Sequence, residues 1–549
     1  MKQIILLFVM CIIGLFIRIT ALDKPEGLWN DEYMGWLIST EELWVPFFKK
    51  MIGNCHMPLY YLYLKAWTTI FGNTDLALRL SSVFTGILCI ISTYFLGKEF
   101  KDKKTGIICA LFATFSGFLI YFSQEVRLYN LIFIISAWGA IFFIKSIRNL
   151  NKFNFLFYIF FNFLLLITHT ISFVYVFFNL LIFSILILKQ HPKFKTKIFI
   201  AYTVLLTCFA PLIPFLINVL TRETLSQNWG IFNLSKIAFV FIDYFTPIQT
   251  NITNSAINLI TYLRTSNLTE SIIFILLPIS IATYFIYKAI KNKDLTLNSM
   301  LICSLLYFIS LIVAAALGKL VLSTKYTVEI YPILILVFAT GITTNFNKLS
   351  KTLSVLYFAI IVIFILTNPN APQQLTRPEG HKTPALLLKQ AQLTENDYII
   401  SLYHQLYRFE KYLDFTPKNT IEIDKTNIAK YLMGKEYSPF DLKHKGKEKL
   451  RNSFMFKDEK EINQRFDEIF ENIPKGTKII ILIPNQVAFF TSLHLPKIAE
   501  NDELYTKTEI MFMAFSYAKI KLLNSAAKYC SHLNTYNKGV WFVITFQKL

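Results

Sequence analysis

Over its first two thirds the chain alternates long apolar segments with short polar ones. A helix that crosses a membrane needs about 20 mostly apolar residues, and runs near this length recur as far as residue 368. They predict about eleven spans, at roughly 3–21, 76–97, 106–122, 130–147, 153–169, 171–188, 198–219, 271–289, 297–317, 328–345 and 352–368. Residues 1–368 are therefore predicted to form a polytopic α-helical membrane domain.

Two stretches of the long segment after the first span have a different character. Residues 33–51 and 58–71 are rich in Trp, Tyr, Phe and Leu, but each is too short or too charged to cross a membrane. Aromatic side chains favour the headgroup region, so both are predicted to be interfacial helices. Pro58 suits the first position of a helix, where its missing N–H would be unpaired anyway. A later segment, residues 220–270, has a similar amphipathic part at 237–245.

The pattern changes after residue 368. Short β-type runs at 397–402, 478–483 and 540–546 are separated by helical patterns such as 458–473. Strands separated by helices are typical of an α/β fold with a partly parallel sheet. Residues 369–549 are predicted to form such a soluble α/β domain, and they contain no glycine-rich nucleotide-binding motif.

Composition and charge set the orientation in the membrane. Hydrophobic residues make up 54% of the chain and charged ones 16%, against about 25% in soluble domains. The net charge of +20 does not indicate a nucleic-acid partner, because the basic residues gather in alternate connecting segments: Lys98, Lys101, Lys103 and Lys104; Lys145, Arg148 and Lys152; Lys189, Lys193, Lys195 and Lys197; Lys288, Lys291 and Lys293; Lys348 and Lys351. Such segments face the cytoplasm. The prediction is an integral protein of the plasma (inner) membrane with a cytoplasmic N-terminus and an extracytoplasmic C-terminal domain.

The candidate catalytic and binding residues then lie in the segments predicted to face outward. Asp31 and Glu32 follow the first span directly, where a carboxylate can take a proton from an acceptor that lies beside the lipid. The alternative is that Asp31 only caps the next helix. His56 precedes the helix that begins at Pro58, whose free N–H groups favour an anion. A solvated loop histidine is the alternative there.

A second group of polar residues lies at the outer ends of later spans. Glu125 and Arg127 would be costly at a span boundary unless they pair or bind something, and the planar guanidinium of Arg127 suits a phosphate. Their alternative role is to anchor the interface. His169 stands alone in an apolar hairpin, where a structural hydrogen bond is the simpler role. Lys325 adds a cation before the span that contains Pro332.

Together these motifs resemble a known family. An acidic pair, H-x-P-L-Y-Y at 56–61, L-R-L-S-S at 78–82, S-Q-E-x-R-x-Y at 123–129 and a Lys-Tyr pair at 325–326 occur in one order over residues 1–345. They resemble the GT-C glycosyltransferases, in particular glycosyltransferase family 39, the protein O-mannosyltransferase-like group that includes lipid A aminoarabinose transferases.

The resemblance implies transfer of a sugar, with inversion, from a polyprenyl-phosphate donor to a lipid, glycan or protein acceptor. Asp31 and Glu32 would be the catalytic pair. The substrate-binding residues would be His56, Tyr60, Tyr61, Glu125, Arg127, Tyr129, His169, Lys325 and Tyr326. Met57 replaces a more usual proline and Lys325 a common arginine. A divalent metal is possible, but no ligand spacing demands one.

A transporter or lipid flippase is the rival class. Transporters usually carry ionisable groups near the membrane midplane and show repeated halves. Here the candidate groups lie at the outer ends of the spans instead. A membrane scaffold whose soluble domain binds a partner is a third possibility, against which the acidic pair argues.

Overall fold

The computed structural model forms two compact units. One contains Met1–Asp23 and Met34–Leu375, and the other contains Lys24–Tyr33 and Thr376–Leu549. The structure describes residues 2–20, 22–53, 57–213, 217, 234–248, 268–317, 319–367, 380, 382–401, 411–413, 418–422, 459–484, 519–538 and 541–549. The segment with the acidic pair thus belongs to the same unit as the C-terminal domain.

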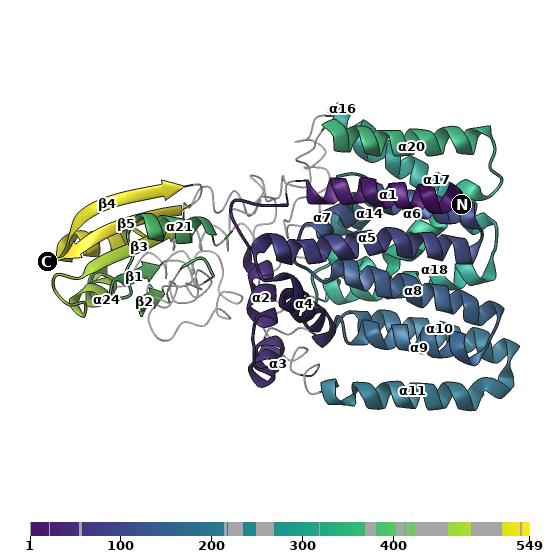
Figure 1. The fold of residues 1–549 in the computed structure, drawn as a ribbon, viewed down its shortest axis with the longest axis horizontal. Helices are drawn as coiled ribbons and strands as arrows, with labels where there is room; N and C mark the ends of the chain where they lie inside the picture. Colours follow the sequence, from purple (N-terminus) through teal and green to yellow (C-terminus); the bar gives the residue numbers. More distant parts are fainter. Residues whose placement is uncertain are drawn as a thin grey trace. The chain divides into compact units, whose positions relative to one another are not determined.

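The first unit is a bundle whose long helices lie side by side with nearly parallel axes (Figure 1). Its main helices are α1 Lys2–Ile19, α5 Asp75–Phe100, α6 Lys103–Phe115, α7 Gly117–Ser123, α8 Tyr129–Arg148, α9 Lys152–Leu166, α10 Ser172–Gln190, α11 Lys195–Phe209, α14 Ser235–Phe245, α17 Leu277–Lys291, α18 Leu295–Ala316, α19 Tyr331–Thr343 and α20 Lys348–Thr367. They confirm the predicted α-helical, multi-pass membrane protein.

Within the described residues, eight helices are long and apolar enough to cross a membrane, or up to nine if a bent pair counts as one span. The bent pair is α6 and α7, which meet at an angle of 57° inside the predicted span 106–122. Helix α9, predicted as a span, is a shorter apolar helix. Short 3-10 and π segments also occur, at Pro192–Phe194, Ala210–Leu212, Ile272–Leu276 and Thr324–Ile330 (η4), with the α-helical turn α16 at Leu268–Ser271.

Several of the basic connecting segments meet at one end of this bundle. Lys101 Nζ donates to Thr343 Oγ1 at 3.2 Å, and Lys288 Nζ donates to the Asn345 carbonyl at 3.1 Å. Arg148 donates to the carbonyls of Glu99 and Phe100. Segments that the charge pattern placed on one side of the membrane are therefore in contact. We call this the basic end.

The segment after α1 folds into three short helices, α2 Asn30–Ser39, α3 Trp44–Gly53 and α4 Pro58–Phe71. Helix α4 has its predicted bounds, with Pro58 at its start after an extended Met57. The predicted helix 33–51 is two helices, separated around residues 41–43.

The C-terminal part of the second unit is a five-stranded sheet in the order β2-β1-β3-β5-β4. Its strands are β1 Tyr398–Ser401, β2 Asn419–Glu422, β3 Lys478–Pro484, β4 Cys530–Lys538 and β5 Trp541–Lys548, with helices α21 Lys382–Gln390 and α24 Glu459–Glu471 (Figure 1). Strand β1 is parallel to β2 and β3, and β5 is antiparallel to β3 and β4. The predicted partly parallel α/β sheet is confirmed.

Alternation along β3 sorts its side chains to the two faces of the sheet. Ile479, Ile481 and Ile483 pack with Phe466 and Phe470 of α24. Ile480 and Leu482 pack with α21 through Leu387 and Leu388. A strand buried on both faces is expected to be apolar throughout, as the run Ile-Ile-Ile-Leu-Ile is.

Candidate active site

The acidic pair lies at the start of α2. Tyr33 N donates to the Trp29 carbonyl at 2.8 Å, so the helix begins just after Trp29. The backbone N–H of Trp29 points at Glu32 Oε2, at 3.4 Å. Glu32 is fully buried and occupies the position from which a glutamate reaches back to the helix start. The capping role considered for Asp31 therefore belongs to Glu32, and Asp31 is only half-buried.

Tyr60 and Tyr61 lie on the first turn of α4, with 4% and 2% of their surface exposed. Their rings contact each other edge to face, with centroids 5.5 Å apart. Such burial favours a role in positioning α4 over direct contact with a substrate. His56 lies outside the described residues.

The residues of the stretch Ser123–Tyr129 have two different roles. Those at its start form hydrogen bonds with backbone carbonyls at the ends of helices. Gln124 Nε2 donates to the carbonyls of Arg18 and Thr20 at 3.2 and 2.9 Å, at the end of α1. The buried Arg18 donates in turn to the carbonyls of Ala113 and Thr114 at 2.9 and 3.1 Å. Those carbonyls end α6 at its break and lack partners within the helix.

Ser123 joins these contacts into one network. Its Oγ accepts from Arg18 Nε at 3.1 Å and from Asn130 Nδ2 at 3.0 Å. A Cβ at Gly86 of α5 would overlap the Ser123 hydroxyl, so glycine is needed for this approach. We call Arg18, Ser123, Gln124 and Asn130 the helix-end cluster.

The second part of the same stretch carries the cation. Arg127 is half-buried, whereas Glu125 and Tyr129 are buried. Arg127 Nη2 donates to Tyr129 Oη at 3.3 Å, and its guanidinium lies 5.6 Å from the centre of that ring. Tyr121 donates its hydroxyl proton to Glu125. Tyr129 therefore holds the Arg127 side chain, and Arg127 is the least buried of these residues.

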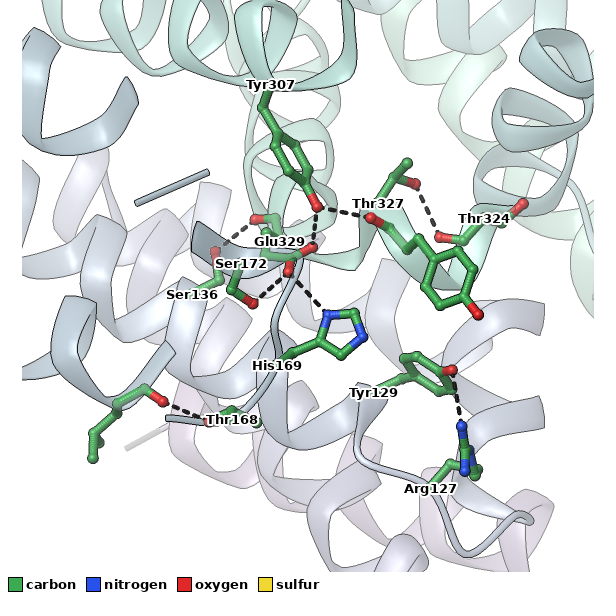
Figure 2. A network of polar contacts seen from close by, with 12 residues as sticks. Arg127, Tyr129, Ser136, Thr168, His169, Ser172, Tyr307, Thr324, Thr327 and Glu329 are labelled. Carbon is green, nitrogen blue, oxygen red and sulfur yellow. Dashed lines mark hydrogen bonds and ion pairs between the residues drawn. The ribbon is translucent and has the colours of Figure 1, made fainter. Parts of the chain in front are cut away.

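A buried carboxylate that the sequence analysis did not single out lies near His169. Glu329 in η4 has no exposed surface. Ser172 Oγ and Tyr307 Oη donate to its two oxygens at 2.6 and 2.9 Å. His169 Nδ1 lies 3.9 Å from Glu329 Oε1, an ion-pair distance for a protonated imidazole. Figure 2 shows these residues in one close view.

Ser136 connects the backbone of Glu329 to α8, the helix that begins at Tyr129. Its hydroxyl donates to the Glu329 carbonyl at 2.6 Å. Ser136 stands seven residues after Tyr129 on α8, so both side chains lie on one face of that helix. We call Glu329, His169, Ser172 and Tyr307 the carboxylate cluster.

Lys325 and Tyr326 lie next to His169. His169 stacks on the Tyr326 ring with centroids 6.0 Å apart, and Lys325 Nζ lies 5.2 Å from the centre of the same ring. All three side chains are half-buried. The structure thus brings His169, Lys325 and Tyr326 together, as one rim above the buried Glu329.

A second buried acid, Asp243 of α14, was also not among the predicted site residues. Thr324 Oγ1 donates to it at 2.5 Å. A sequence signal existed for both acids, since an ionisable residue at or inside an apolar segment is costly unless it has a function or a partner. In the part of the chain that the structure describes, no group of three or more His, Cys, Asp or Glu side chains could hold a metal ion.

No protein-family profile matches the chain, and neither does any curated protein. Solved structures do match. ArnT from Cupriavidus metallidurans matches in its apo state with a TM-score of 0.55 and bound to undecaprenyl phosphate with 0.51. Both alignments have 10% identity and cover 99% of this chain and 98% of ArnT. The oligosaccharyltransferase from Archaeoglobus fulgidus aligns with a TM-score of 0.48 and 11% identity, over 98% of this chain and 72% of its own.

The ArnT matches define the fold. ArnT, a lipid A aminoarabinose transferase, is a GT-C glycosyltransferase, and the present chain has its architecture over nearly the whole of both chains. The resemblance to GT-C glycosyltransferases seen in the sequence motifs is therefore confirmed for the fold.

Proposed function

We propose that the protein is a membrane glycosyltransferase that moves a sugar from a polyprenyl-phosphate donor to a lipid, glycan or protein acceptor on the outer face of the membrane. The observation that carries this proposal is the set of half-buried basic side chains, Arg127, His169 and Lys325, which lie near buried acids and tyrosines. The fold shared with ArnT supports it. A transporter needs no such set at the outer ends of its helices.

The cations serve the departing group. When the bond between the sugar and the donor phosphate breaks, negative charge develops on the phosphate, and positioned positive groups stabilise it. Arg127 suits this role because its planar fork can bind two phosphate oxygens. Lys325 and His169 supply further positive charge or hydrogen bonds. Glu329 holds the region together through Ser172 and Tyr307.

Asp31 is proposed as the general base. It removes the proton of the acceptor group as that group attacks the anomeric carbon on the face opposite the phosphate, which inverts the configuration. Glu32 is occupied at the helix start, so the two adjacent carboxylates have different tasks. A divalent metal at the donor phosphate is compatible with this scheme.

The replacement Asp31→Asn tests the proposal. It keeps the shape and hydrogen-bonding capacity of the side chain but removes its basicity, and general base catalysis contributes a factor of about 10² to 10⁴. We expect the envelope glycan that is lost in a deletion strain to stay absent with this variant, at a normal protein level in the membrane. Glu32→Gln should reduce it less.

Asp102→Asn is the matched control. Asp102 also stands at a helix start, where it accepts from Thr105 N at 2.7 Å, but at the basic end. It should restore the glycan fully. A normal glycan with Asp31→Asn would disprove the assignment of the base, and full loss only with Glu32→Gln would move the base to Glu32.

The orientation needs its own test. Single cysteines placed near Asp102 and Lys293 should be protected from a membrane-impermeant thiol reagent in intact cells. A cysteine near Lys460 should react. The opposite labelling pattern would put the proposed site on the cytoplasmic face and overturn the proposal.

A further inference from the structure

The segment that carries the acidic pair is bonded to the C-terminal part of its unit at two sites, Glu26 and Leu28. Lys382 N, at the start of α21, donates to the Glu26 carbonyl at 3.0 Å. Leu28 N donates to the hydroxyl of Tyr412 at 2.7 Å. The donor and acceptor of this second bond are 384 residues apart in the chain.

Two glycines allow the backbones to approach this closely. Gly27 has φ +77°, and a Cβ there would come within 2.5 Å of Lys382 Cβ and 2.7 Å of Tyr412 Oη. A Cβ at Gly380 would overlap the Glu26 carbonyl oxygen. Any side chain at either position would push the two backbone segments of this contact apart.

Both residues that bond to this segment, Tyr412 and Lys382, belong to parts of the chain that pack against the sheet. Tyr412 packs against the cluster that contains Leu388, Ile399 and Ile480, and α21 contributes Ala385 and Leu387 to the same cluster. The contact therefore has rigid support, although Tyr412 itself lies outside the strands and helices.

The bonds continue from this contact to the acidic pair. Leu28 N is held by Tyr412, and the next amide, Trp29 N, points at Glu32. Trp29 then accepts from Tyr33 in the first turn of α2. Successive amides are thus fixed from Leu28 to the helix start, which sets the direction in which Asp31 projects.

We propose that Tyr412 and the start of α21 are positioning elements for Asp31, so that the C-terminal domain holds the general base in its reactive direction. This inference rests on the proposed function. Binding of the donor phosphate, which we assign to Arg127, His169 and Lys325, does not depend on the contact. A misplaced base lowers the turnover rate, since small displacements at a reacting group are costly.

The test uses Tyr412→Phe in the full-length protein. We expect faster amide hydrogen exchange, by about fivefold, in peptides that cover residues 24–30, because one hydrogen bond is worth about 1 kcal/mol. The envelope glycan made by a complemented deletion strain should fall several-fold. Affinity for undecaprenyl phosphate, used as the binding probe in nanodiscs, should stay within twofold of wild type.

Tyr536→Phe is the matched control, since Tyr536 packs on the same cluster but has no described bond to the segment. It should change neither exchange at residues 24–30 nor the glycan. A second pair of variants does not depend on Tyr412. Gly27→Ala should reproduce the effects of Tyr412→Phe, whereas Gly476→Ala, at φ +75° with open space around it, should not.

The outcomes separate the two proposals. Unchanged exchange, or faster exchange with normal glycan, in both Tyr412→Phe and Gly27→Ala would overturn the positioning role while the function proposal stands on Asp31→Asn. Weaker binding of undecaprenyl phosphate would also overturn it, because the contact would then act on the donor. A fully active Asp31→Asn would refute the base and, with it, the positioning of a base.

Discussion

Two polar clusters inside the helix bundle contain similar residues but have different roles. In the helix-end cluster, Arg18 and Gln124 direct donors to backbone carbonyls where α6 and α1 end. In the carboxylate cluster, Ser172 and Tyr307 direct donors to one side chain, Glu329. In the first cluster, the Arg18 and Gln124 side chains bond to backbone carbonyls. In the second, Glu329 faces His169, a half-buried residue of the candidate site. The destination of the hydrogen bonds thus distinguishes a structural cluster from a candidate site.

The largest expected effect is on stability, from Arg18→Met. This change leaves the Ala113 and Thr114 carbonyls without their buried donor, and each such group costs about 1–3 kcal/mol. We expect destabilisation by about 3 kcal/mol, measured as a lower midpoint of thermal unfolding in detergent. Thr20→Ala, at the exposed end of the same helix, is the control. An unchanged midpoint with Arg18→Met would remove the structural half of the comparison.

Glu329→Gln should act in the opposite way. The amide keeps the size of the side chain and one acceptor oxygen, but removes the charge that Ser172, Tyr307 and His169 face. A hydrogen bond to a charged group is worth about 1.5–3 kcal/mol, which predicts a loss of sugar transfer of about 10- to 100-fold. The unfolding midpoint should change little. A large fall in stability with normal transfer per folded molecule would make Glu329 structural as well.

Arg127→Lys addresses the cation that we propose to bind the donor phosphate. Lysine keeps the charge but loses the planar fork, so affinity for undecaprenyl phosphate should fall roughly tenfold, the equivalent of about 1.4 kcal/mol. Arg148→Lys changes an arginine at the basic end that bonds to the carbonyls of Glu99 and Phe100. It should leave the affinity unchanged. Equal affinity in both variants would assign Arg127 to anchoring the interface.

The smallest effects are expected from a matched pair of serines. Ser123→Ala removes a hydroxyl from the helix-end cluster and should cost about 1 kcal/mol of stability, with sugar transfer unaffected. Ser172→Ala removes a hydroxyl from Glu329 and should lower transfer about fivefold, again about 1 kcal/mol. Both quantities are measured on the same purified samples. If the two variants behaved alike, the clusters would not differ in kind.

The sequence predicted the fold well because the signals are local. Apolar runs near membrane length predicted most of the bundle, and Pro58 marked the start of α4. The alternation of β-type runs with helices predicted the sheet domain. The break between α6 and α7 was missed, and the carbonyls at the end of α6 accept hydrogen bonds from Arg18, which is distant in the sequence. The edge strand β4 was missed because its sequence, C-S-H-L-N-T-Y-N-K, is mostly polar.

The candidate site was predicted less completely. Arg127, His169, Lys325 and Tyr326 were singled out, and the last three do lie together. Glu329 was not identified because it lies within the predicted span 328–345, and that segment was interpreted only as an apolar helix. The attachment of the acidic pair to Tyr412 could not be read from the sequence, since no local pattern relates positions 384 residues apart.

That separation along the chain has a consequence for the order of biosynthesis. Ribosomes add about 5–20 residues per second, so Tyr412 is made roughly 20–80 seconds after Leu28. During this interval the bond between Leu28 and Tyr412 cannot exist, whatever the first helices have already done. The bond from Leu28 therefore forms only after Tyr412 has been synthesised. A chain truncated by a premature stop codon before residue 412 would therefore insert its helices without forming this bond.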